Sequence, residues 1–193
     1  MKGAMRKLLL GALTSSLALA GCARSALPPL TGPTSTANAS QRMESAGSGE
    51  AGPLQFQVKR YPGNAPYDVA GDRGSVVLLD VWATWCEPCR DALPMYEQLA
   101  REYGSRGLKV YALNVDEDPR AIPAFLQETK INLPILVDEN AKVAEQALKV
   151  RLMPTTFLVD RKGVVRFVHE GFAEEFLQKY QNEIEQLLAE PAK

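Results

Sequence analysis

Two cysteines three positions apart, Cys86 and Cys89, separate a continuous apolar run from an amphipathic pattern. The run over residues 76–81 holds one acid among branched apolar residues, which is typical of a strand buried on both faces. The pattern over residues 87–103 repeats apolar side chains every three or four positions and stops before a glycine, which predicts a helix. Cys86 is therefore predicted where a buried strand gives way to the start of a helix.

This position favours redox chemistry at the cysteine pair. The unpaired N–H groups and the dipole at a helix start stabilise a thiolate, and they lower the pKa of a thiol from its ordinary value of about 8.5. Cys86 begins the helix and is expected to be the more exposed nucleophile, whereas Cys89 lies one turn further along as the resolving thiol. The predicted reaction is attack by Cys86 on a partner disulfide, followed by resolution of the mixed disulfide by Cys89.

A structural zinc site is the alternative interpretation of two cysteines at this spacing. Zinc usually takes four ligands. The chain has only one other cysteine, Cys22, and one histidine, His169, which we expect to be structural. This shortage of ligands argues against zinc, and we expect neither a metal nor another cofactor.

Residues 77–89, with the sequence Val-Leu-Leu-Asp-Val-Trp-Ala-Thr-Trp-Cys-Glu-Pro-Cys, resemble the active-site segment of the thioredoxin superfamily. Residues 153–160, Met-Pro-Thr-Thr-Phe-Leu-Val-Asp, resemble its cis-proline strand, and Pro94 matches the proline that kinks its active-site helix. The narrower resemblance, over about residues 52–190, is to the TlpA/ResA-type membrane-anchored thiol-disulfide oxidoreductases. It implies an α/β fold, a thioredoxin-like mixed sheet flanked by helices, with an inserted helix–strand element.

Strand and helix patterns alternate along the chain, as such a fold requires. The predicted strands cover residues 54–58, 76–81, 108–115, 133–137, 155–159 and 164–168. The predicted helices cover residues 87–103, 118–130, a stretch after Asp138, and 176–188. Pro123 is unfavourable inside the second helix, so this helix either kinks or begins later. The strand at 54–58 is expected at an edge of the sheet, and residues 118–137 supply the inserted element.

Asp80 is a lone acid in the first central strand. Burial of an unpaired carboxylate is unfavourable, so the pKa of Asp80 is expected to rise. Asp80 matches by position the buried acid of thioredoxins, which implies a proton acceptor for Cys89. The alternative is a solvated or hydrogen-bonded acid at a strand edge. Many TlpA/ResA relatives carry asparagine at this position, and they carry glutamate where this chain has Ala92, so their acidic proton relay is not transferred to this chain.

The remaining site residues are assigned by the same resemblance. Glu87 and Pro88 lie between the thiols and resemble the Cys-Glu-Pro-Cys motif of reducing envelope proteins. A carboxylate near a thiol disfavours the thiolate, which helps to keep the couple reducing. Met153 and Pro154 are expected to face the disulfide and to dock the substrate together with Trp85, Glu87 and Pro88.

Residues 1–21 have the order of a bacterial lipoprotein signal peptide. A positive start precedes a short apolar stretch, and the sequence Leu-Ala-Gly-Cys that ends at Cys22 resembles a lipobox. We expect cleavage before Cys22 and acylation of this cysteine, which would hold the protein to a membrane. An ordinary signal peptide and an uncleaved anchor are the alternatives. Residues 22–52, rich in small and polar side chains, are predicted to be a disordered tether, and residues 53–190 the thioredoxin-like domain.

These features predict an exported, membrane-anchored thiol-disulfide oxidoreductase of the bacterial cell envelope. It would reduce disulfides of specific exported proteins, such as those of cytochrome c maturation. Its expected partners are disulfide-bearing exported clients, a membrane or envelope thiol electron donor, and the membrane through a lipid on Cys22. An envelope thiol oxidant or peroxidase, and a thioredoxin-fold module that binds cysteine- or metal-bearing partners, are the alternatives. The formal net charge of −1 argues against a nucleic-acid partner.

Overall fold

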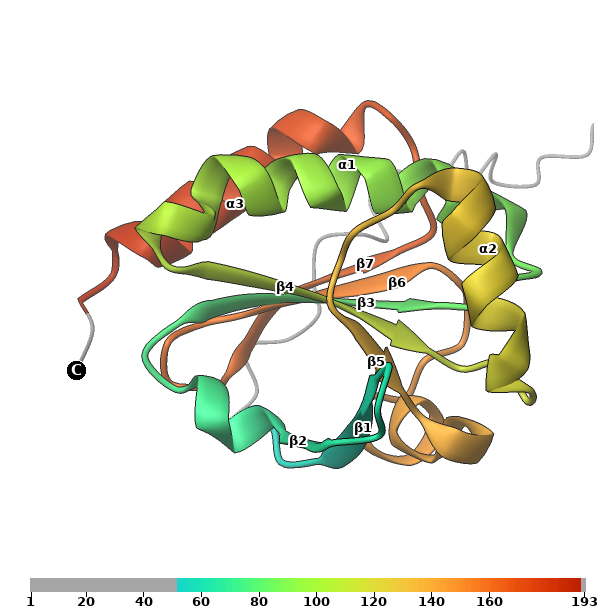
Figure 1. Ribbon diagram of the computed structural model, residues 1–193. Helices are drawn as coiled ribbons and strands as arrows, with labels where there is room; N and C mark the ends of the chain where they lie inside the picture. Colours follow the sequence, from blue (N-terminus) through green and yellow to red (C-terminus); the bar gives the residue numbers. More distant parts are fainter. Residues whose placement is uncertain (1–51, 192–193) are drawn as a thin grey trace, which may run out of the picture. The chain divides into compact units, whose positions relative to one another are not determined.

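A computed structural model describes residues 52–191, which form a mixed seven-stranded sheet with helices packed on it (Figure 1). The strand order is β2-β1-β5-β4-β3-β6-β7. The strands are β1 Gln57–Tyr61, β2 Pro66–Asp68, β3 Val76–Trp82, β4 Leu108–Asn114, β5 Ile135–Val137, β6 Thr155–Val159 and β7 Val165–Glu170.

Helices cover one face of this sheet, and shorter helical turns and loops cover the other (Figure 1). The α-helices are α1 Glu87–Tyr103, α2 Ile122–Thr129 and α3 Phe176–Ala189. The short turns are η2 Val69–Asp72, η3 Gly104–Arg106, η4 Pro119–Ala121, η5 Glu139–Ala141 and the π-helical η6 Val143–Ala147. Buried side chains of α1, α2 and α3 share one core with one face of β3, whereas η2 and η6 contribute to the second core.

Strand β3 is central because it pairs in parallel with β4 and antiparallel with β6. All of its residues are buried. Leu78 and Trp82 join the core beneath α1 and α3, whereas Leu79 and Val81 join the core on the opposite face. Successive side chains of a strand point to opposite faces, so Asp80 lies in the layer beneath α1. Burial on both faces explains the continuous apolar run.

The predicted active-site helix is confirmed, and the strands predicted at 155–159 and 164–168 pair with each other as a hairpin. The helix expected over residues 87–103 is α1. The hairpin consists of β6 and β7, and Asp160 closes its turn by accepting the N–H groups of Lys162 and Val164 at 2.9 and 3.0 Å. Gly163 in this turn has a φ of +80°, which glycine adopts without the steric cost of a Cβ atom.

The prediction for the first strand is wrong in its position. β1 begins at Gln57, and the short strand β2, which the sequence did not reveal, pairs outside it. β1 also pairs with β5 on its other side, so it is not an edge strand. A three-residue strand that contains Pro66 is too short to give a periodic signal.

The helix predicted after Asp138 is replaced by η5 and η6. Asp138 does act as a cap, because its carboxylate accepts the N–H groups of Val143 and Ala144 at 3.0 and 2.8 Å. Asn140 and Ala141 have φ values of +61° and +53°, which interrupt a right-handed helix. The prediction of an α-helix here is therefore wrong, although Asp138 does bind the first N–H groups of η6.

The inserted helix–strand element is present between β4 and the end of β5. Asp118 accepts the N–H of Arg120 at 3.0 Å and starts η4, and α2 begins only at Ile122. Pro123 consequently lies in the first turn of α2, where its missing N–H leaves no hydrogen bond unmade. β5 then joins the sheet between β1 and β4.

No helix within residues 52–191 has the length and the apolar content that a membrane crossing requires. The predicted signal peptide, Cys22 and the tether up to residue 51 lie outside the described residues.

Candidate active site

The two cysteines form a disulfide at the N-terminus of α1. Cys86 is the N-cap residue, and its Cα atom lies 5.3 Å from that of Cys89. Pro88 occupies the first turn of the helix. The exposed fraction is 5% for Cys86 and 0% for Cys89, so the prediction that Cys86 is the more exposed cysteine is confirmed. Of the two cysteines, Cys86 is thus the one that keeps some contact with solvent.

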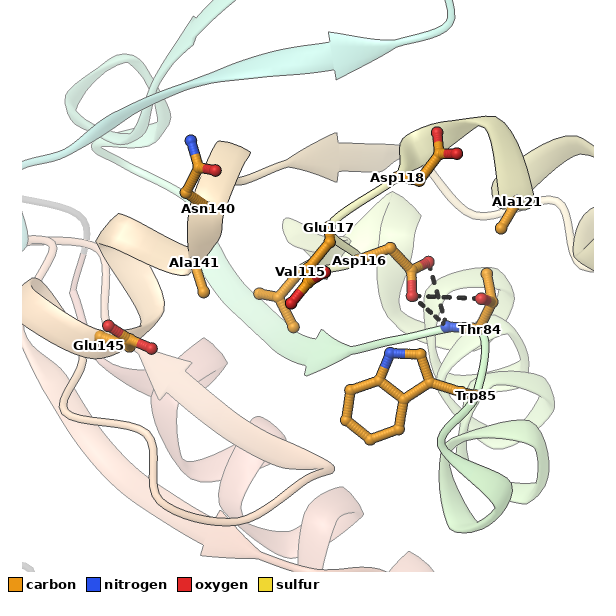
Figure 2. Close-up of a pocket in the computed structure, with 10 residues that line it drawn as sticks. All are labelled: Thr84, Trp85, Val115, Asp116, Glu117, Asp118, Ala121, Asn140, Ala141 and Glu145. Carbon is orange, nitrogen blue, oxygen red and sulfur yellow. Dashed lines mark hydrogen bonds between the residues drawn. The ribbon is translucent and has the colours of Figure 1, made fainter.

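A buried carboxylate fastens the turn that leads into Cys86. Asp116, just beyond the end of β4, accepts the N–H of Thr84 at 3.1 and 3.2 Å and its hydroxyl at 3.2 Å (Figure 2). The side-chain amide of Asn114 donates to the same carboxylate at 2.8 Å. Trp85 follows Thr84 directly and is 70% exposed. Its indole thus projects into solvent from a fixed turn beside the disulfide.

The loop before β6 supplies a second exposed apolar side chain. The Met153–Pro154 peptide bond is cis, as the resemblance implied. Met153 and Leu152 help to line a shallow apolar hollow of about 170 Å³, and Leu152 is 53% exposed. Leu152 and Trp85 are the large apolar side chains that the described residues leave in solvent.

A larger cavity of about 660 Å³ opens beside Trp85 (Figure 2). Its wall contains the carboxyl groups of Asp116, Glu117, Asp118 and Glu145. Asp116 accepts hydrogen bonds from Thr84, and Asp118 forms an ion pair with Arg120 at 2.7 Å. The cavity and the apolar hollow share the residues Val115, Ala141 and Glu145. The surface near the disulfide is therefore apolar towards Met153 and acidic towards the end of β4.

Asp80 is 1% exposed, in the layer in which Cys89 is also buried. The hydroxyl of Thr156 donates to Asp80 Oδ1 at 3.0 Å, whereas Oδ2 has no hydrogen-bond partner within residues 52–191. Burial raises the pKa of Asp80 well above its ordinary range, and the bond from Thr156 opposes this rise only in part. The predicted burial is confirmed. Asp80 is not solvated, but it is hydrogen-bonded, as the alternative interpretation also allowed.

A cluster of three hydroxyl groups, which the sequence did not indicate, reaches this carboxyl through Thr156. Tyr96 Oη lies 2.7 Å from Thr156 Oγ1, and Tyr180 Oη donates to the same oxygen at 3.1 Å. The two tyrosine hydroxyls are 3.3 Å apart. Helical periodicity indicates that Tyr96 and Tyr180 are core residues but does not reveal their polar partners. Thr156 stands opposite Asp80 in the β3–β6 pairing, a register that no local pattern in the sequence defines.

Glu87, between the cysteines, extends into solvent. Its side chain is 88% exposed, and the nearest ionic contact is 3.9 Å, to Arg90 Nε. Arg90 itself pairs more closely with Glu128 of α2, at 2.9 Å. The charge of Glu87 is therefore near the thiols but well hydrated, which weakens its action on them.

His169 has a partner that the sequence did not indicate. Its Nε2 lies 2.6 Å from Glu183 Oε2, and both residues are buried. The ring of His169 also packs on that of Tyr180, with centroids 4.6 Å apart. This pair joins β7 to α3, in agreement with the predicted structural role of His169. In the described part of the chain, no group of three or more histidine, cysteine or acidic residues is arranged to bind a metal ion.

A family profile described as AhpC/TSA matches residues 54–168, which is more than half of the chain. The chain belongs to the AhpC/TSA family. Among curated proteins, it is 33% identical over 111 residues to the thiol-disulfide oxidoreductase ResA of Bacillus subtilis, a match that covers 57% of this chain and 62% of ResA. It is 29% identical over 140 residues to ResA of Oceanobacillus iheyensis, which covers 70% and 72% of the two chains. The match spans less than two thirds of the length of the first of these relatives.

Solved structures of the same fold include proteins of this family type. A crystal structure of a putative thiol:disulfide interchange protein DsbE from Chlorobium tepidum has a TM-score of 0.66 and 30% sequence identity, and the match covers 72% of this chain and 97% of that one. The exposed lipoprotein thioredoxin Etrx1 of Streptococcus pneumoniae, with 24% identity and a TM-score of 0.60 over 69% of this chain and all of that one, shares the fold. The predicted thioredoxin-like fold and the resemblance to ResA-type proteins are confirmed.

Proposed function

We propose that the protein is a thiol-disulfide oxidoreductase that reduces disulfides of exported proteins. The observation that supports this most directly is the Cys86–Cys89 disulfide at the start of α1, with Cys86 the more exposed cysteine and an exposed tryptophan beside it. The names of the ResA and DsbE relatives describe the same chemistry. A module that only binds partners does not need two thiols at this spacing.

In the reduced protein, the thiolate of Cys86 attacks one sulfur of the client disulfide. A bond forms between Cys86 Sγ and that sulfur, and the other client sulfur leaves as a thiolate. The thiolate of Cys89 then attacks Cys86 Sγ, which closes the disulfide and releases the second client sulfur. Two electrons pass from the cysteine pair to the client, so an envelope thiol donor must reduce Cys86–Cys89 again before the next cycle.

Asp80 is assigned as the acceptor of the Cys89 proton in the second step. The assignment is supported by its burial in the same layer as Cys89 and by its unpartnered Oδ2. Burial keeps the carboxyl protonated to a higher pH than usual, and this brings its proton affinity closer to that of a thiol. Clients would dock on the surface formed by Trp85, Met153 and Pro154, with Glu87 and Pro88 at its rim.

The envelope location and the clients are part of the proposal. The lipobox-like sequence at Cys22 supports attachment to a membrane through lipid, with residues 22–52 as a tether. The Cys-Glu-Pro-Cys motif supports a role in cytochrome c maturation, in which the clients are exported apocytochromes.

The test is catalytic reduction of insulin with a chemical dithiol as electron donor. We expect turnover by the wild type, none by Cys86→Ser, and accumulation of mixed disulfides by Cys89→Ser because resolution is blocked. Absence of turnover, together with binding of reduced or metal-bearing peptides, would support a binding module instead.

The reduction potential of the couple decides the direction of exchange. We expect a value nearer that of thioredoxin, about −270 mV, than that of the oxidant DsbA, about −120 mV. Equilibration with glutathione or dithiothreitol measures it. A reduction potential near that of DsbA would mean that the protein is a thiol oxidant and not the proposed reductant.

A further inference from the structure

Asp80 is held by a cluster of hydroxyl groups from three different elements. Thr156 lies on β6, Tyr96 on α1 and Tyr180 on α3, and all three residues are fully buried. Thr156 Oγ1 lies 3.0 Å from Asp80 Oδ1, 2.7 Å from Tyr96 Oη and 3.1 Å from Tyr180 Oη. The single hydroxyl of Thr156 therefore stands between the carboxyl and both phenols.

The capacity of a hydroxyl group fixes the direction of these bonds. A hydroxyl donates one hydrogen and accepts up to two, whereas an ionised carboxylate only accepts. When Asp80 is ionised, Thr156 must donate its hydrogen to Asp80, and it then accepts from Tyr96 and Tyr180. Burial raises the pKa of Tyr180 to about 12 and that of Tyr96 well above its ordinary value, so both phenols keep the hydrogens they donate. Two such donors polarise the Thr156 hydroxyl and strengthen its bond to the carboxylate.

We propose that Tyr96 and Tyr180 are positioning residues for disulfide exchange, which act through the Thr156 hydroxyl to orient and stabilise the Asp80 carboxylate that accepts the Cys89 proton. The inference rests on the proposed function. It goes beyond that function because it assigns the support of the buried acid to a hydroxyl relay from α1 and α3.

The groups near Asp80 offer the carboxylate no source of stabilisation other than this hydroxyl relay. Thr156 of β6 bonds to Asp80 directly, and Tyr96 of α1 and Tyr180 of α3 bond to Thr156. Cys89 of α1 is buried in the core on the same face of the sheet. The neighbouring residue on β4 is Ala112, which does not titrate. Behind Tyr180 stand His169 and Glu183, which bond to each other. Within residues 52–191, Thr156 is the one hydrogen-bond donor to Asp80, and no basic side chain forms a salt bridge with this acid.

The first measurement follows the Asp80 carboxyl itself, without catalysis. Infrared difference spectra of the oxidised full-length protein detect the C=O band of the protonated acid, which is assigned by its loss in Asp80→Asn. We expect Thr156→Val to raise the pH midpoint of this band by about one to two units, since it removes a hydrogen bond to a charged group. Tyr96→Phe and Tyr180→Phe should each raise it by less, and Thr156→Ser should restore the wild-type midpoint.

Tyr103→Phe is the matched control. Tyr103 is a buried tyrosine of the same helix as Tyr96, but its hydroxyl points to Glu185, at 3.4 Å. This variant should leave the midpoint of the Asp80 band unchanged. Equal shifts in Tyr103→Phe and Tyr96→Phe would mean that any loss of a buried hydroxyl loosens the core, and would overturn the proposal.

The second measurement separates the two steps of exchange by stopped flow with a small peptide disulfide. The pH midpoint of resolution by Cys89 should move upward in the same order as the infrared midpoint, while the rate constant of Cys86 attack stays within about twofold of wild type. An unchanged resolution profile in the Tyr96 and Tyr180 variants overturns the positioning role, with or without an infrared shift. A wild type that attacks no disulfide would instead refute the proposed function, which the infrared measurement does not depend on.

Discussion

Replacement of Asp80 by asparagine should make the stability of the oxidised protein less dependent on pH. The carboxyl is 1% exposed, accepts one hydrogen bond and leaves Oδ2 unpartnered within the described residues. Burial raises its pKa above the value of about 3.9 that an aspartate has in an unfolded chain. The folded protein therefore binds this proton more tightly than the unfolded chain does.

The sign and size of the effect follow from this difference. Between the unfolded and the folded pKa of Asp80, the folded state holds more protons, so the free energy of unfolding of the wild type falls as the pH rises, by up to about 1.4 kcal/mol per pH unit. Asp80→Asn removes this term. In acid, the variant should lie within about 1 kcal/mol of wild type, because the protonated carboxyl and the amide both leave a buried donor without an acceptor. The variant should then become the more stable protein as the pH rises.

Urea unfolding of both proteins at pH values from 4 to 9 measures the effect. The disulfide is kept intact, so that no cysteine titrates. Asp68→Asn serves as a control of opposite sign, because Asp68 is exposed and its bonds to the Ala70 N–H and to Gln57 lower its pKa. Stability from these bonds is present above the unfolded pKa of about 3.9 and is lost only below it, so this variant should be less stable than wild type by a nearly constant amount between about pH 5 and 9.

A constant difference in unfolding free energy between Asp80→Asn and wild type across this range would refute the reasoning. It would mean that the carboxyl ionises in the folded protein as readily as in the unfolded chain. A difference that grows in the other direction would indicate a cation that stabilises the carboxylate.

Two further changes test the docking surface and the anchor. Trp85→Ala should raise the KM for a protein disulfide by about tenfold while kcat changes little, because the indole is 70% exposed and is proposed to bind the client. The unfolding free energy should stay within about 0.5 kcal/mol of wild type, and an equal loss of kcat would place Trp85 in the chemical steps instead. Cys22→Ser should release the mature protein from membranes in cell fractionation, provided that the signal is still cleaved, and mass spectrometry that finds an unmodified Cys22 in the wild type would contradict lipid attachment.

The sequence predicts those features of the site that depend on residues close together along the chain. Cys86 and Cys89 sit at a strand-to-helix junction that apolar periodicity alone locates, and α1 has the predicted bounds. Asp80 is recognisable because an acid interrupts an otherwise apolar strand. These features are visible because each depends on residues close together along the chain.

The remaining features depend on contacts between distant segments. Thr156 meets Asp80 across strands that are 76 positions apart, and Tyr180 reaches the same hydroxyl from the last helix. The partner of His169 likewise comes from another element. The failure after Asp138 has a different cause, because two successive residues with positive φ override an apparently helical pattern. Tertiary context decides both kinds of feature, and local propensity does not encode it.

The hydrogen bonds of Asp116 to Thr84 fix the turn before Cys86, whereas the residues that follow Asp116 do not hold this turn. Asp116 is buried and holds the turn at Thr84, whereas the next residues, Glu117 and Asp118, are exposed where they line the cavity. Neutral substitutions at these two exposed positions would make the cavity wall less acidic and would leave the bonds of Asp116 to Thr84 in place. The charge of this wall can therefore change, during evolution or by design, separately from the turn that carries Cys86.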